Sequence, residues 1–224
     1  MDEAHPSVAR GAEAARCEPG AVSRRSFVQT LGLSAVGASL AGAPDRSCAG
    51  PARPEGPEVL GPGPAKLTLR VNGRDLSSEV EPATTLLDYL RIHHGQTGSK
   101  EICDRGACGG CSVLVDGMLV TSCMMLARDA EGKEITTVEG LEKEGALHPV
   151  QEAFIRHDAL QCGYCTPGLV IAAVALLNSN PKPTIDEIKA GLAGNICRCG
   201  TYTNIFNAVL EVSGQHPITD GEGR

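Results

Sequence analysis

The sequence has few aromatic residues and no tryptophan. Its 224 residues include three tyrosines and three phenylalanines, so aromatic residues make up only 3% of the chain. This scarcity excludes a large core of packed rings, and the 42% of hydrophobic residues must fill small cores with Leu, Val, Ala and Ile. A chain this hydrophobic is not disordered throughout. We expect small two-layer units that bound prosthetic groups help to hold together.

Positive charge is also in short supply. Lys and Arg number 20 against 27 Asp and Glu, and the formal net charge is −7. A protein that binds nucleic acid needs a basic surface to neutralise phosphates, and no basic stripe is present. We therefore expect no nucleic-acid partner, and an acidic soluble surface accounts for the charge.

The N-terminal region carries an export pattern. An uncharged, weakly apolar run over residues 31–43 follows Arg24-Arg25 and Phe27. It has the length of a signal-peptide hydrophobic region and is well short of the ~20 residues that span a membrane. The small residues at its end suit signal cleavage. Together these features resemble a twin-arginine signal peptide, so we expect residues 1–43 to engage the twin-arginine export machinery, which delivers folded proteins to the periplasm.

Three further parts follow the signal. Residues 44–65 are rich in proline and glycine without an apolar period, which predicts an extended linker. Residues 66–144 and 145–218 show strand and helix periodicity respectively, and residues 219–224 form a short tail. The expected fold class is α+β.

The pattern over 66–144 predicts a small sheet with a helix across it. Alternating strands over 66–71 and 74–80 meet at Asn72-Gly73, a strong hairpin signal. Thr84 or Thr85 can cap a helix whose apolar positions are Leu86, Leu87 and Leu90. Further strands are expected over 111–115 and 118–121, joined by a two-residue turn at Asp116-Gly117, and over 135–138. Hairpin, helix and hairpin in this order outline a β-grasp, plant-type ferredoxin-like domain.

The pattern over 145–218 predicts a four-helix bundle. Helices are expected to begin at His148-Pro149 and Thr166-Pro167, where proline suits the first turn. A capping box at residues 184–187 starts the third helix, and the fourth is expected over about 203–212.

Cysteine carries the strongest chemical signal. Eight of the ten cysteines form two sets of four, and Cys17 and Cys48 fall in the signal and the linker. Three thiols spaced C-x4-C-x2-C with a fourth further on are the plant-type pattern for a [2Fe-2S] cluster. The first cysteine set comprises Cys103, Cys108, Cys111 and Cys123. Residues 103–111 form the first-set loop, which contains Gly106, Gly109 and Gly110. These glycines let the backbone approach the cluster and point N–H groups at its sulfurs.

The second cysteine set is placed at helix ends. Its members are Cys162, Cys165, Cys197 and Cys199. The positive end of a helix favours thiolates, so this set is predicted to hold a second [2Fe-2S] cluster. Each set could instead bind zinc, which also favours C-x2-C spacing. The thiols could also form a disulfide framework, or Cys162 and Cys165 a thioredoxin-like pair, although that pair lacks its βαβ context.

Three segments together resemble a known family. They are the first set, the run Gln161-Cys-Gly-Tyr-Cys-Thr-Pro-Gly168, and the run Gly194-Asn-Ile-Cys-Arg-Cys-Gly-Thr-Tyr202. The chain resembles the small iron–sulfur subunits of molybdenum hydroxylases, and is most similar to those of exported periplasmic aldehyde oxidoreductases.

That resemblance implies an electron relay. A large subunit with a molybdenum–pterin cofactor would oxidise an aldehyde or hydroxylate a heterocycle. Electrons would pass through the second set and then the first to an FAD-binding medium subunit or a cytochrome. Gln161 and Cys199 would approach the pterin.

No general base or nucleophile is evident in the sequence, so the chain is not expected to catalyse a reaction alone. His93, His94, His148 and His157 are expected to be solvated rather than ligands. Two other functions remain open: a free-standing two-cluster ferredoxin and a zinc-stabilised exported binding module.

Overall fold

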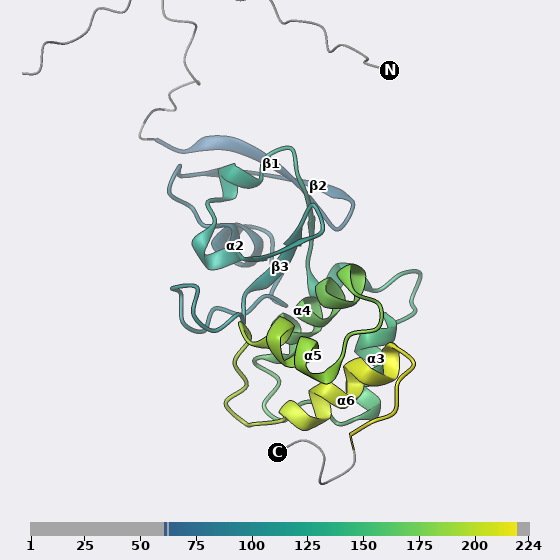
Figure 1. Ribbon diagram of the computed structural model, residues 1–224. Helices are drawn as coiled ribbons and strands as arrows, with labels where there is room; N and C mark the ends of the chain where they lie inside the picture. The colour runs from purple at the N-terminus through teal and green to yellow at the C-terminus, as the bar shows by residue number, and fades with distance from the viewer. Residues whose placement is uncertain (1–60, 62, 219–224) are drawn as a thin grey trace, which may run out of the picture. The chain divides into compact units, whose positions relative to one another are not determined.

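The computed structural model describes residue 61 and residues 63–218 (Figure 1). The chain divides into two units, 1–54 and 55–224, and every described residue belongs to the second. The predicted signal peptide, nearly all of the linker and the tail lie outside the described residues. Among the helices of residues 61 and 63–218, none is long and apolar enough to cross a membrane.

A five-stranded mixed sheet forms the first half. Its strands are β1 (Ala65–Val71), β2 (Arg74–Val80), β3 (Ser112–Val115), β4 (Met118–Thr121) and β5 (Glu134–Thr136), in the order β2-β1-β5-β3-β4. Both predicted hairpins are confirmed, with positive φ at Asn72-Gly73 and Asp116-Gly117 as tight turns require. β1 and β5 pair in parallel. The expected fifth strand ends two residues early, because Val138 already begins a 3₁₀ turn.

A short helical segment covers the sheet. α2 (Leu86–Asp88) continues as a π-helical turn (Tyr89–His93), and Thr85 caps it by accepting a hydrogen bond from the Asp88 N–H. Tyr89 is fully buried, and its hydroxyl donates to the Leu76 carbonyl at 2.6 Å. Three 3₁₀ turns complete this half: Ser122–Met124, Ala127–Ala130 and Val138–Leu141.

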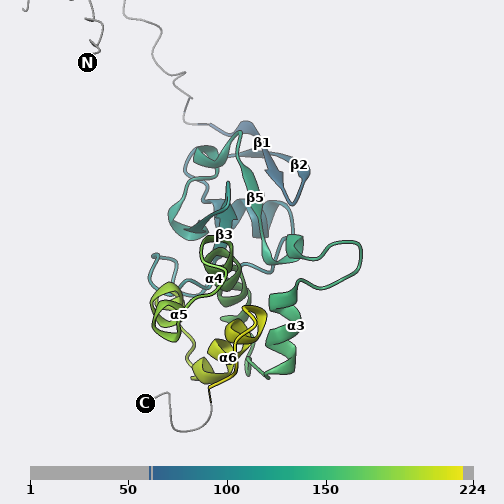
Figure 2. The same cartoon turned by 45° about the vertical axis from the view of Figure 1, so that its right-hand side comes forward.

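Four helices form the second half: α3 (Pro149–Arg156), α4 (Thr166–Ser179), α5 (Ile185–Leu192) and α6 (Tyr202–Val212). Each begins at or next to its predicted start. α4 is apolar on every side, and residues 168–174 are all buried. A helix that is hydrophobic all round must be covered on all sides. α3, α5 and β3 all pack against α4 (Figure 2).

Strand β3 joins the two hydrophobic cores. Val113 and Val115 belong to the core of the sheet, whereas Leu114 belongs to the core of the helices. Successive side chains of a strand point to opposite faces, so one strand can serve both cores. All four residues of β3 are buried for this reason.

Three of the histidines that were expected to be solvated are half-buried instead. His94 Nε2 lies 2.9 Å from Ser78 Oγ, and burial, with the neighbouring His93 charge, lowers its pKa. His148 caps α3, accepting the Val150 N–H on Nδ1. His157 pairs with Glu211. His93 is exposed as expected.

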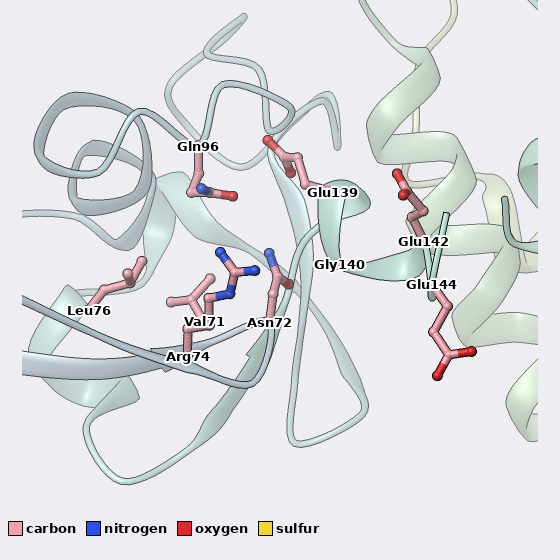
Figure 3. A pocket seen from close by; sticks show the side chains of 9 residues that line it. All are labelled: Val71, Asn72, Arg74, Leu76, Gln96, Glu139, Gly140, Glu142 and Glu144. Carbon is pink, nitrogen blue, oxygen red and sulfur yellow. The ribbon is translucent and has the colours of Figure 1, made fainter. Parts of the chain in front are cut away.

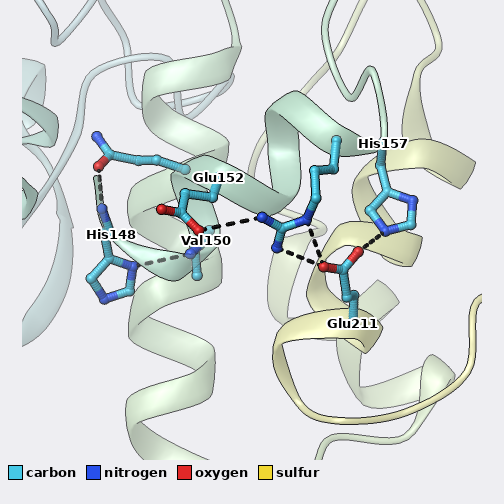
Figure 4. A network of polar contacts seen from close by, with 7 residues as sticks. His148, Val150, Glu152, His157 and Glu211 are labelled. Carbon is cyan, nitrogen blue, oxygen red and sulfur yellow. Dashed lines mark hydrogen bonds and ion pairs between the residues drawn. The ribbon is translucent and has the colours of Figure 1, made fainter. Parts of the chain in front are cut away.

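Ion pairs connect α3 to α6 (Figure 4). Glu211 of α6 accepts from Arg156 at 2.6 Å and lies 2.5 Å from His157 Nε2, and both of these residues are at the end of α3. Arg156 also contacts Glu152 one turn earlier. Hydrogen bonds from Arg156 and His157 lower the pKa of Glu211. The carboxylate therefore links the end of α3 to α6.

Candidate metal centres

The first cysteine set is assembled by a loop and a hairpin. Cys103 and Cys108 lie half-buried in the first-set loop, and Cys111 lies at its end, beside β3. The β3–β4 hairpin pairs Ser112 with Thr121, which brings Cys123 back next to Cys111. These two thiols are 6% exposed or less and pack against Leu87. The register of the β3–β4 hairpin thus places Cys123 beside Cys111, which lies twelve residues earlier in the sequence.

Sulfurs in this set approach one another in pairs. A backbone hydrogen bond at Arg105 and a side-chain hydrogen bond with Cys108 lower the pKa of Cys103 to about 7. Burial and a hydrogen bond with the Cys111 thiol raise the pKa of Cys123 to about 11. The Gly106 N–H donates to Cys123 Sγ at 3.3 Å. Two thiol pairs with backbone N–H support suit an anionic cluster of two irons, each held by two thiolates.

Two loop glycines have conformations that favour glycine. Gly106 and Gly109 have φ of 70° and 68°, where a side chain is strained. A Cβ on Gly106 would lie 2.8 Å from Met124 Cγ. Gly110 has no such φ, but a Cβ there would collide with the Ile102 side chain. These three glycines therefore let other segments of the protein pack closely against the first-set loop.

The second cysteine set lies at the ends of α4, α5 and α6. Cys165 is the N-cap residue of α4, and Cys197 lies between α5 and α6; both are buried. Cys162 and Cys199 are exposed, and so is Gln161. The structure thus brings two thiols of this set to the surface.

Hydrogen bonds distinguish the two buried thiols of the second set. Burial and a hydrogen bond with Cys197 raise the pKa of Cys165 to about 12. Burial acts in the same direction on Cys197, but hydrogen bonds from Thr201, Cys165 and Gly200 together outweigh it and lower the pKa of Cys197 to about 7. Thr201 Oγ1 lies 3.2 Å from Cys197 Sγ, and the Cys197 N–H donates to the Tyr202 hydroxyl at 2.8 Å. Thr201 and Tyr202 end the run 194–202 that carried the family resemblance, but the sequence alone assigned them no role.

The arrangement of the thiols indicates which kind of site they form. All eight described cysteines are free thiols, so the disulfide framework that the sequence allowed is not formed among them. In the part of the chain that the structure describes, no three His, Cys, Asp or Glu side chains gather as a single-ion site requires. In the first set, Cys103 with Cys108 and Cys111 with Cys123 form two thiol pairs, which match two irons each held by two thiolates.

Two of the hollows on the described surface differ in their lining. One, of about 450 Å³, is lined by polar residues including Asn72, Arg74, Gln96 and Glu139 (Figure 3). Asn72 already bonds Thr137, and Glu139 accepts the Gly98 N–H, so these groups serve the fold. The other hollow is apolar, about 420 Å³, and lies between α3 and the start of α4.

Sequence comparison assigns both halves. A profile described as a 2Fe-2S iron-sulfur cluster binding domain matches residues 69–140, and one described as a [2Fe-2S] binding domain matches residues 137–210. The aldehyde oxidoreductase iron-sulfur-binding subunit PaoA of Escherichia coli K12 is 40% identical over 209 residues, covering 87% of this chain and 89% of PaoA. The chain belongs to the iron–sulfur subunits of the molybdenum hydroxylases. The resemblance seen in the sequence is therefore confirmed.

Other iron–sulfur subunits and structures of this family are also similar to this chain. The nicotine 6-hydroxylase small subunit of Paenarthrobacter nicotinovorans is 47% identical, over 67% of this chain and 90% of its own. The crystal structure of quinoline 2-oxidoreductase from Pseudomonas putida 86 superposes with a TM-score of 0.65 at 41% identity, covering 67% of this chain and 94% of that chain. As an iron–sulfur subunit with two [2Fe-2S]-binding domains, the chain is an electron-transfer component of a molybdenum-dependent oxidoreductase.

Proposed function

We propose that this chain relays electrons from a molybdenum–pterin subunit to a separate acceptor through two [2Fe-2S] clusters. The observation that carries the proposal is the presence of two sets of four free thiols, one in each matched cluster-binding domain. The names of the relatives include oxidoreductases of aldehydes, nicotine and quinoline, so the partner's substrate would be an aldehyde or a nitrogen heterocycle.

Each cluster would be held by one cysteine set. Cys103, Cys108, Cys111 and Cys123 would bind the first cluster within a β-grasp, ferredoxin-like domain over residues 66–144. The second cluster would lie in a four-helix domain over residues 145–218, with the ligands Cys162, Cys165, Cys197 and Cys199. When bound, each cluster accepts one electron and passes it on. The chain's own contribution is to bury one side of each set and to donate hydrogen bonds to its sulfurs.

Exposure of the thiols suggests the direction of the relay. Cys162 and Cys199 are exposed, together with Gln161, and Tyr164 beside them is 58% exposed. A large subunit that covers this surface could bring its pterin close to Gln161 and Cys199. Electrons would leave from the first set, to an FAD-binding subunit or a cytochrome.

Export is part of the proposal. Arg24-Arg25, Phe27 and the uncharged run that follows them would direct the folded complex through the twin-arginine machinery to the periplasm. The alignment with PaoA covers 87% of the chain, which is more than the residues that the structure describes. Replacing both arginines by lysine is expected to retain the assembled complex in the cytoplasm. Periplasmic delivery of that variant would contradict the signal assignment.

Metal analysis of the complex purified from its native host tests the central claim. We expect about four irons and about four sulfides per chain, two of each per cluster, with the visible absorption of iron–sulfur proteins. Zinc in place of iron would support a zinc-stabilised binding module. Stable co-purification with a molybdenum subunit is expected, and its absence would support the free-standing ferredoxin.

A further inference from the structure

Asn195 extends from one cysteine set to the other. It lies two residues before Cys197, yet its side chain bonds to the first-set loop. Asn195 Nδ2 donates to the Gly109 carbonyl at 2.8 Å and to Ser112 Oγ at 3.2 Å. Only 4% of Asn195 is exposed, and Ser112 is similarly buried. A buried amide with two acceptors on a segment more than 80 residues away in sequence is a specific tertiary contact.

The acceptor of this bond lies between two predicted ligands. Gly109 follows Cys108 directly, and Cys111 is two residues further on. The Gly109 carbonyl also accepts from the Ser112 hydroxyl at 2.8 Å and from the Ser112 N–H at 3.1 Å. With Asn195 included, three donors hold this one oxygen, so its peptide plane is fixed.

Around the Asn195–Gly109 bond, the first-set loop also contacts residues 195–196 and the start of α4 directly. A Cβ on Gly109 would lie 2.5 Å from Asn195 Nδ2, and a Cβ on Gly168 of α4 would collide with the Gly109 carbonyl. The Ile196 N–H donates to the Cys108 carbonyl at 2.9 Å. Among these contacts, the Asn195 amide is the side-chain group that reaches across to the first-set loop. The other contacts are made by backbone atoms, at positions where a glycine leaves room for them.

We propose that Asn195 is a positioning residue that clamps the first-set loop onto residues 194–200, the second-set loop. The clamp fixes the separation and the relative orientation of the two cysteine sets. Electron exchange and magnetic coupling between two metal centres fall steeply with distance, so a loosened clamp weakens both. Asn195 does not contact a thiol in this role; it acts through the backbone that carries Cys108 and Cys197.

The first test measures magnetic coupling in the intact complex. Asn195→Ala removes the amide, and Asn204→Ala is the control, because Asn204 also makes a side-chain-to-backbone bond, to Asp158, away from the two loops. After full reduction with dithionite, electron paramagnetic resonance should show both cluster signals at full intensity in every variant. The splitting from spin–spin interaction should shrink or broaden in Asn195→Ala alone. Unchanged splitting at full occupancy would overturn the proposal.

A second readout follows the loops themselves. In hydrogen exchange measured by mass spectrometry, loss of the two buried hydrogen bonds of Asn195 should speed exchange by about fivefold or more in peptides covering both loops. Faster exchange confined to the second-set loop would show that Asn195 is a local structural residue and would contradict the clamp. Asn195→Ser, which keeps a small polar side chain, is a second variant. Loss of either cluster from both variants would also contradict a positioning role.

Discussion

The backbone N–H of Ile196 donates to the carbonyl oxygen of Cys108 at 2.9 Å. One of these residues directly precedes Cys197 of the second set, and the other belongs to the first set. This backbone hydrogen bond therefore joins the two predicted cluster sites directly, in addition to the bonds that the Asn195 amide makes to Gly109 and Ser112. Half of Ile196 is exposed, so its side chain is not what makes this contact. Close backbone approach of this kind depends on small residues nearby.

Gly168→Ala tests that dependence. Alanine is the better helix former by about 0.5–1 kcal/mol, yet its Cβ would collide with the Gly109 carbonyl. We expect a net loss of about 1–3 kcal/mol and a fall in melting temperature of roughly 2–10 °C. Gly191→Ala is the matched control, because its Cβ would meet only the end of the flexible Leu176 side chain at 3.0 Å. Thermal melting of the holoprotein, followed by circular dichroism, measures both. Equal melting temperatures for the two variants would contradict the close contact.

Thr201→Val tests the hydroxyl beside Cys197. Valine keeps the shape of threonine but removes the hydrogen bond to Sγ at 3.2 Å. Hydrogen bonds to cluster sulfurs stabilise the more negative, reduced state, so the reduction potential of the second cluster should fall. A hydrogen bond worth about 1 kcal/mol corresponds to a shift on the order of 40 mV for one electron. A redox titration monitored by electron paramagnetic resonance gives the value. Thr201→Ser, which retains the hydroxyl, should stay close to the wild-type potential.

His148→Asn tests the cap of α3. His148 Nδ1 can accept the Val150 N–H only when it is unprotonated. Burial, with the nearby Lys143 charge, lowers the pKa of His148 below its ordinary 6.5. Its contribution to stability is therefore complete above about pH 6.5 and is lost as the pH falls toward the folded-state pKa. Asparagine caps well and does not titrate, so His148→Asn should lose less stability between about pH 7 and pH 5.5.

His148→Ala serves as the comparison for that variant. Removing the cap should cost about 1 kcal/mol at neutral pH. Melting temperatures across the same pH range distinguish the three proteins. A wild-type profile parallel to that of His148→Asn would contradict the capping role.

Glu211→Gln tests the connection between α3 and α6. Hydrogen bonds from Arg156 and His157 hold the pKa of Glu211 below its ordinary value of 4.5. Its stabilising effect is present above that value and is lost as the pH falls through the folded-state pKa. Glu211→Gln should therefore be less stable than wild type near neutral pH, and the difference should narrow below about pH 4. High salt should also reduce the stability difference between Glu211→Gln and wild type, because the Arg156–Glu211 ion pair is partly exposed. Melting curves at two pH values and two salt concentrations check both effects.

The sequence alone determined the local structure and the chemical type of this protein. Asn72-Gly73 and Asp116-Gly117 predict hairpins because few residue pairs tolerate positive φ, and the capping residues Thr85 and Thr184 place helix starts. Cysteine spacing predicted the first cluster because three ligands from one short loop must be a fixed number of residues apart, and placement at helix ends predicted the second. These signals lie within short segments, so they can be read without the fold.

Only the tertiary structure decided how distant segments meet. The burial of Leu114 in the helical core and the parallel pairing of β1 with β5 join residues far apart in sequence. The same holds for Asn195 on Gly109. Asn195 and Thr201, which lies beside Cys197, both belong to the run 194–202 that carried the family resemblance, but the sequence assigned neither of them a role. Asparagine and threonine are common in loops and at helix starts, so their types carry no signal of a particular partner. What distinguishes Asn195 is burial against a specific acceptor, the Gly109 carbonyl, which it meets only once the two halves have packed together.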